Sequence, residues 1–131
     1  MENLVVPAEL KKKLEERGSV ISRPKGTVLF RRGDPAQGLF LVRRGEVTLG
    51  LGCESAAYPP RMLGAGSVVG LPATMSGAPY SLTAEVTEDS QLSFVPRSVV
   101  LKLLRSSPEL GFAVMAILGD EISKIRSAVS G

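Results

Sequence analysis

The sequence predicts a mainly β fold, a double-stranded β-helix (jelly roll) with a short helix before it and a long helix after it. Short runs of β-branched and aromatic residues recur after the first 18 residues, turn-forming residues separate them, and a helical hydrophobic period returns near the C-terminus. The chain has 131 residues, which is the size of one domain. We expect a single domain over 1–131, with an N-terminal helix at 1–18, a β-roll at 19–96 and C-terminal helices at 97–129.

The N-terminal helix is predicted by its start, its stripe and its stop. Pro7 suits the first turn of a helix, and Leu10 and Leu14 are four residues apart on one face. Gly18 then supplies the C-terminal stop.

Eight short strands are expected in the roll, because turn chemistry interrupts the apolar runs at regular intervals. Pro24-Lys25-Gly26, Arg44-Gly45 and Glu88-Asp89-Ser90 are examples of the expected turns. Strands this short favour a jelly roll or small barrel over a sandwich of long strands. The expected strands are 20–22, 27–31, 38–43, 46–51, 61–63, 67–69, 81–86 and 91–95.

Helical periodicity follows the roll in two segments. The first covers 97–105, and the second begins at Pro108 and carries one narrow apolar stripe. Such a stripe packs either against its own β-roll or against the same helix of a second copy, and its length favours a symmetric homodimer. The stripe consists of Leu110, Val114, Leu118, Ile122 and Ile125, with Val129 after them.

Composition excludes several classes of function. The chain has no histidine and one cysteine, Cys53, so it has no Ser-His-Asp or Cys-His machinery, no histidine-rich metal site and no intrachain disulfide. We therefore expect no enzyme and no metal. No apolar stretch approaches the roughly 20 residues of a membrane span, and no signal-peptide core follows Met1, so a cytoplasmic protein is expected. The net charge of +3 comes from interspersed charges of both signs.

The most specific motif is residues 26–47, GTVLFRRGDPAQGLFLVRRGEV. Gly33 and Gly45 stand where tight turns need a positive φ. The segment resembles the cyclic-nucleotide-binding domain family, in particular the effector domain of catabolite-activator-type (Crp/Fnr) transcription regulators. The resemblance extends over nearly the whole chain and implies a jelly roll with a regulatory role.

In that family a glycine-rich turn opening a one-turn helix binds a cyclic phosphate, and residues 66–84, GSVVGLPATMSGAPYSLTA, match this segment. Gly66, Gly70 and Pro72 keep its framework. Leu71, however, aligns with the ribose-binding glutamate of the family and Tyr80 with its phosphate-binding arginine. The candidate ligand-binding residues are Gly70, Leu71, Ala73, Tyr80, Ser81 and Thr83.

The resemblance thus implies a regulatory ligand-sensing or signalling module with a degenerate phosphate-binding cassette and no resident cofactor. Losing both recognition residues argues against tight binding of a cyclic nucleotide. Two alternatives stay open: a ligand-free interaction or structural domain in which Leu71 and Tyr80 close the old pocket, and an effector-domain fragment of a DNA-binding transcription regulator. Because no recognition helix fits before Gly131, we expect no output domain and no DNA binding by this chain alone. The expected partners are a second copy, a small ligand or a partner protein, and no membrane.

The stripe yields a direct prediction. Light scattering at tens of micromolar protein is expected to give the mass of a dimer, because in a monomer this long apolar stripe would remain partly exposed to water. Leu118→Glu or Ile122→Glu should convert it to a monomer. A monomeric mass for the unchanged protein would contradict the prediction.

Overall fold

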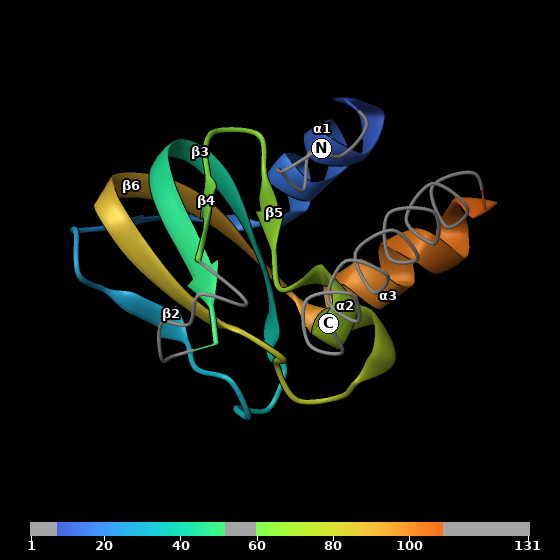
Figure 1. Cartoon of the computed structure of the whole chain (residues 1–131). Coiled ribbons are helices and arrows are strands. Elements are labelled where there is room, and N and C mark those ends of the chain that lie inside the picture. Colours follow the sequence, from blue (N-terminus) through green and yellow to red (C-terminus); the bar gives the residue numbers. More distant parts are fainter. Residues whose placement is uncertain (1–7, 52–59, 109–131) are drawn as a thin grey trace.

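The computed structural model describes residues 8–51 and 60–108, and within them it confirms a mainly β fold with a short helix before the roll and a helix after it. All three described helices lie on one side of the roll (Figure 1). The predicted apolar stripe from Leu110 onward lies outside the described residues. The elements are α1 (Ala8–Arg17), β1 (Ser19–Arg23), β2 (Val28–Phe30), β3 (Gly38–Gly50), β4 (Arg61–Leu63), β5 (Val68–Val69), α2 (Leu71–Ser76), β6 (Thr83–Pro96) and α3 (Arg97–Ser106).

The sheet is organised around its two long strands. β3 pairs antiparallel with β6 from Gly38 opposite Pro96 to Gly50 opposite Thr83. β1 and β2 add to β6, while β4 and β5 add to β3, and every one of these pairings is antiparallel. Both long strands curve over the roll, so each contributes to two of its walls (Figure 1).

Two of the expected turns are wrong. Arg44-Gly45 does not separate two strands but lies inside β3, and Glu88-Asp89-Ser90 lies inside β6. The reason is a series of register shifts between Val42 and Val47, which bend the ladder without ending it. Polar residues that favour a turn can also bond backbone groups that a bent strand leaves unpaired. The Ser90 hydroxyl, for example, accepts a hydrogen bond from the Glu46 N–H at 3.0 Å. Fewer and longer strands result.

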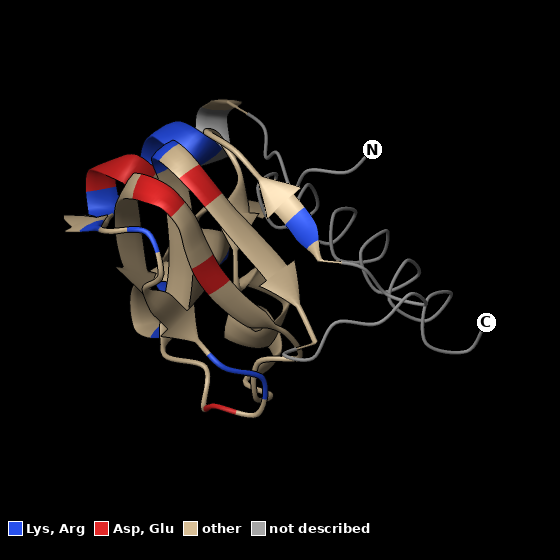
Figure 2. Ribbon diagram, turned by 60° about the vertical axis from the view of Figure 1, so that its left-hand side comes forward, with Lys and Arg blue, Asp and Glu red and all other residues tan. Residues whose placement is uncertain are grey.

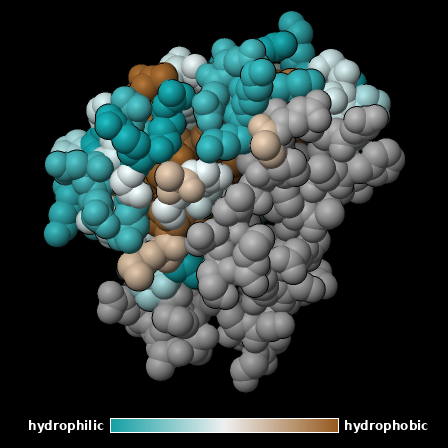
Figure 3. Space-filling model, turned by 90° about the horizontal axis from the view of Figure 1, so that it is seen from above, coloured by the Kyte–Doolittle hydropathy of each residue, from teal (hydrophilic) through white to brown (hydrophobic). Residues whose placement is uncertain are grey.

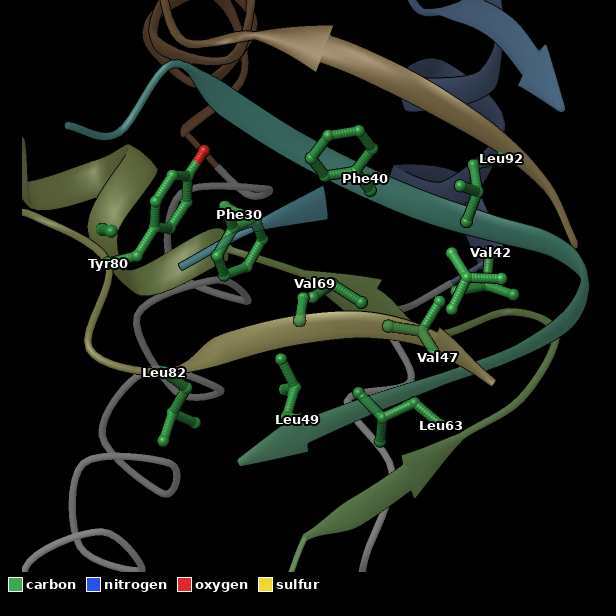
Figure 4. Packing of buried hydrophobic residues seen from close by; sticks show 13 residues of the cluster. Phe30, Phe40, Val42, Val47, Leu49, Leu63, Val69, Tyr80, Leu82 and Leu92 are labelled. Carbon is green, nitrogen blue, oxygen red and sulfur yellow. The ribbon is translucent and has the colours of Figure 1, made fainter. Parts of the chain in front are cut away.

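Two apolar clusters hold the fold together, one on each face of β3. Along β3 the side chains alternate, so that Phe40 and Val42 point into the roll while Leu39 and Leu41 point to the helices. Both clusters are buried, and this explains the continuous apolar run at the start of β3. The inner cluster is shown in Figure 4. The helix-side cluster comprises Leu14, Leu39, Leu41, Val68, Leu71, Val95, Val100 and Leu103.

The described surface carries charges of both signs. Lysines and arginines of α1 and the adjoining strands lie beside acidic residues at the same end of the roll (Figure 2). One such pair, Arg43 and Glu15, joins β3 to α1 at 3.8 Å. Seen from above, the described atoms are mostly hydrophilic, with small hydrophobic patches (Figure 3). Among the described helices none is long and apolar enough to cross a bilayer.

The bend in β3 gives a stability test with a matched control. Gly45 has φ 99°, and a methyl group there would lie 2.7 Å from the Asp89 carbonyl oxygen and against the Ser90 side chain. Gly33 has a similar φ of 93° but open space around it. Gly33→Ala should therefore cost only the left-handed backbone strain, about 1–2 kcal/mol, and Gly45→Ala about 1–3 kcal/mol more. Urea unfolding measures both, and equal losses would contradict this account of the bend.

Candidate ligand-binding site

The candidate cassette is built around the short helix α2, which glycines bound at both ends. Gly70 precedes the helix with φ 89° and Gly77 follows it with φ 79°, conformations that favour glycine. Pro72 lies in the first turn, where a helix tolerates the absence of an N–H. The Thr74 hydroxyl donates a hydrogen bond back to the Gly70 carbonyl oxygen at 2.6 Å. The local sequence thus fixes where α2 starts and stops.

Tyr80 is the most extensively bonded of the predicted site residues. Its side chain is 4% exposed, and its ring stacks on Phe30 at a centroid distance of 3.7 Å and an angle of 11° (Figure 4). Its hydroxyl donates to the Gly38 carbonyl oxygen at 2.6 Å and accepts from the N–H groups of Gln37 and Gly38 at 3.2 and 3.3 Å. The phenol is thereby a buried link between the cassette and the first residue of β3.

The Tyr80 ring also lies against the start of α2. A methyl group added to Gly70 would be 3.1 Å from the Tyr80 ring and 3.4 Å from the Phe30 ring. The same methyl group would be 3.3 Å from the Gly38 carbonyl oxygen. Carbon atoms of two rings therefore occupy the space in front of Gly70.

Leu71 faces a different part of the molecule from Tyr80. Its side chain belongs to the helix-side cluster with Leu39 and Leu103, whereas Tyr80 and Ala73 belong to the inner cluster. A leucine at this position has no polar atom, and its neighbours in the cluster are hydrocarbon. The structure therefore places Leu71 and Tyr80 in two separate apolar environments.

The two remaining candidates lie nearer the surface. Ser81 is exposed, and Thr83 is half-buried at the start of β6. The Thr83 hydroxyl accepts a hydrogen bond from the Arg32 N–H at 2.9 Å, so it ties β6 to the end of β2. Of the six candidates, Gly70 and Tyr80 are thus in mutual contact, while Ser81 points to solvent.

Three residues outside the predicted candidates also contribute to this site. Phe30 and Gly38 contact Tyr80 from β2 and β3, and Arg97 reaches α2 from the start of α3. The Arg97 Nε donates to the Thr74 carbonyl oxygen at 3.0 Å, and its backbone N–H donates to the Gln37 carbonyl oxygen at 2.9 Å. These contacts join segments more than 20 residues apart, and no local motif signals them.

The cassette itself carries no charge. From Gly64 to Ala84 the sequence has no Lys, Arg, Asp or Glu, so any ionic contact with a ligand must come from another segment. Among the described residues no group of three or more His, Cys, Asp or Glu side chains is placed to hold a metal ion. What the described cassette offers is backbone N–H groups, hydroxyls and aromatic surface.

Comparison with known proteins identifies the fold family. The family model of the cyclic nucleotide-binding domain matches residues 20–107. Among solved structures, a protein of a cyclic-GMP-dependent signalling pathway in bacterial phytopathogenesis has a TM-score of 0.75 at 23% identity, with 92% of this chain and 94% of that chain aligned. The catabolite activator protein of Thermus thermophilus has a TM-score of 0.75 at 25% identity, with 95% of this chain aligned. This chain spans 59% of that one.

A Thermotoga maritima transcriptional regulator is similar over 90% of this chain and 93% of its own length, at 18% identity and a TM-score of 0.73. No curated protein matches the sequence significantly. The structural matches below 25% identity establish the fold, and the family model covers two thirds of the chain and includes Leu71 and Tyr80. With its jelly roll, its glycine-bounded α2 and this match, the chain belongs to the cyclic nucleotide-binding domain family.

Proposed function

We propose that this chain is a non-enzymatic regulatory module that senses a ligand, and that its phosphate-binding cassette no longer holds a cyclic nucleotide tightly. One observation supports the proposal: Tyr80, which the resemblance aligns with the family's phosphate-binding arginine, is buried, stacked on Phe30 and bonded to Gly38. The regulatory role rests on family membership and on similarity to signalling proteins and transcription regulators.

The chemistry of the two substitutions supports a loss of affinity. An arginine gives a phosphate a charge-assisted, often bidentate contact, and a phenol that already bonds Gly38 offers none. A glutamate accepts the ribose hydroxyls, and Leu71 offers only hydrocarbon. Each such contact is worth about 1.5–3 kcal/mol, so the joint loss amounts to about two to four orders of magnitude in affinity.

The ligand of this module is expected to differ from those of its structural relatives. One relative is described as c-di-GMP responsive, and another was solved in its cAMP-bound form. Both ligands are anionic phosphodiesters, whereas the segment from Gly64 to Ala84 provides no cation. We therefore propose a less charged ligand, with the backbone of α2 and nearby hydroxyls as contacts.

A ligand-free interaction domain is the second candidate, and the packing in front of Gly70 favours it. Tyr80 and Phe30 fill that space with carbon, as a permanently closed site would require. Extraction of the purified protein with denaturant, followed by mass spectrometry of the small molecules released, separates the two candidates. A stoichiometric small molecule supports the sensor, and repeated absence of one supports the interaction domain.

Two further features are proposed. The chain spans 59% of the Thermus thermophilus catabolite activator protein, which suits an effector domain of a longer regulator. A homodimer is proposed on the basis of the apolar stripe that begins at Leu110.

Titration calorimetry with cyclic AMP tests the proposed loss of affinity. We expect no binding tighter than about 100 μM, because two charge-assisted contacts are missing. Tyr80→Arg, in protein whose circular dichroism is that of the folded chain, should recover at least about tenfold in affinity, since the cation returns beside Gly70. Ser81→Arg is the matched control: it adds the same charge one residue away on an exposed side chain and should recover none. Low-micromolar binding by the unchanged protein would refute the degenerate cassette, as would equal recovery in both variants.

Tyr80→Phe tests how far the hydroxyl stabilises the roll. The change keeps the stack on Phe30 but leaves the buried Gly38 carbonyl and its N–H without their phenol partner. We expect the free energy of unfolding to fall by about 1–3 kcal/mol. Thr83→Val is the control, because it removes a hydroxyl that bonds an exposed N–H and should cost less. Urea denaturation measures both, and a loss below about 0.5 kcal/mol for Tyr80→Phe would show that the hydroxyl bonds contribute little.

A further inference from the structure

We propose that the hollow beside the turn between β2 and β3 binds a small flat aromatic molecule that carries an amino or ammonium group. The hollow has a volume of about 310 Å³ and lies among β2, the following turn, β3 and β6. Apart from Tyr80 it is lined by none of the six candidate cassette residues. The proposal therefore does not rest on the proposed function.

Aromatic side chains form the floor of the hollow. Phe40 lies 5.0 Å from Phe94 and 6.2 Å from Phe30 between ring centroids, and Phe30 stacks on Tyr80 at 3.7 Å. Three of these rings are visible side by side in Figure 4. Aromatic pairs prefer offset-stacked or edge-to-face contact at 4.5–7 Å, so a further flat ring continues this row favourably. Phe94, which is only half-buried, is the ring that such a ligand would cover.

The size of the hollow limits the ligand to one or two rings. Leu29 and Pro35 add apolar lining, and small-molecule sites usually measure about 300–1,000 Å³. At about 310 Å³ this hollow is at the lower end of that range. A cyclic dinucleotide is therefore too large for it.

Asp34 determines the charge of the ligand. It is the only charged residue among those that line the hollow, and Gln37 is the other exposed polar one. Its carboxylate is positioned by its own turn, because Oδ2 accepts the Arg31 N–H at 3.0 Å and its carbonyl accepts the Tyr80 N–H at 3.0 Å. Within the described parts of the chain Oδ1 accepts no hydrogen bond, so it can accept one from an amine.

These features select a cation and disfavour an anion. The Asp34 carboxylate attracts an ammonium group by charge, and the ring faces that line the hollow attract it by cation–π contact. The same carboxylate repels a phosphate, so the ligands of the structural relatives do not suit this hollow. An arylalkylamine combines the flat ring with the cation.

Tryptamine is a suitable probe, because the protein contains no tryptophan and the fluorescence anisotropy of the indole reports binding directly. We expect saturable binding with a Kd below about 1 mM. Phe94→Leu and Asp34→Asn should each weaken it at least about fivefold. Asp89→Asn is the matched control, since Asp89 is also an exposed aspartate that accepts a backbone N–H, from Lys25 at 2.8 Å, but it lies away from the hollow. It should change the Kd less than about twofold.

Three results would overturn the proposal. One is the absence of saturation up to about 5 mM tryptamine in protein whose far-ultraviolet circular dichroism is that of the folded chain. The second is equal binding of indole-3-propionate, which has the same ring with a carboxylate in place of the ammonium. The third is displacement of tryptamine by cyclic AMP, which would make the hollow part of the cassette. If cyclic AMP binds tightly without displacing tryptamine, the proposed function fails but the proposal for the hollow stands.

Discussion

The hydrogen bonds of Tyr80 to the turn between β2 and β3 are the interaction on which the arrangement of this roll depends. The Tyr80 N–H and carbonyl bond Asp34 and Gly33 at 3.0 and 2.8 Å, and the phenol bonds Gly38 at the first residue of β3. Backbone and side chain of one residue thus fix both ends of the turn. Because Arg97 donates to the Gln37 carbonyl at the same turn, the start of α3 is set by it as well. Cassette, long strand and C-terminal helix therefore share one anchor.

This anchor has a chemical consequence for the cassette. The resemblance aligns Tyr80 with the arginine that binds the cyclic phosphate in the family. Here it presents a ring, and that ring is stacked on Phe30 and closed against Gly70. Tyr80 thus makes a packing contact, and Leu71 makes another on the helix side, where it joins Leu39 and Leu103. The proposed function follows from this burial: the two side chains stabilise the fold, and neither offers a charged group to an anion.

The fold could be predicted well from sequence because its signals are local. Glycine and proline mark the ends of α1 and α2, and the apolar runs correspond to strands in all eight expected places. The prediction that β3 and β6 are each divided into two strands was wrong. The residues at Arg44-Gly45 and Glu88 to Ser90 are compatible both with a turn and with a bend inside a continuous strand. Only the pairing partner, forty or more residues away, decides between them: Glu46 bonds Ser90 across the sheet.

The candidate site was less predictable than the fold, because its contacts join segments that are far apart in the sequence. The resemblance marked Gly70, Leu71 and Tyr80 as neighbours in one cassette, but Leu71 on α2 packs in the helix-side cluster, whereas Tyr80, after α2, packs in the inner cluster. Phe30 and Gly38, which contact Tyr80, lie 50 and 42 residues before it in the sequence. Such contacts depend on the closed roll and carry no signature in the neighbouring sequence.

The central claim is that Tyr80 has taken the place of the phosphate contact. Nitrogen-15 chemical shifts of the Gly70, Leu71 and Ala73 amides during titration with cyclic AMP test it most directly, because these N–H groups belong to the start of α2. The account predicts that these shifts stay unchanged at micromolar nucleotide, with at most weak, unsaturated drift at about 1 mM. Saturating shifts confined to these amides at low micromolar nucleotide would contradict it.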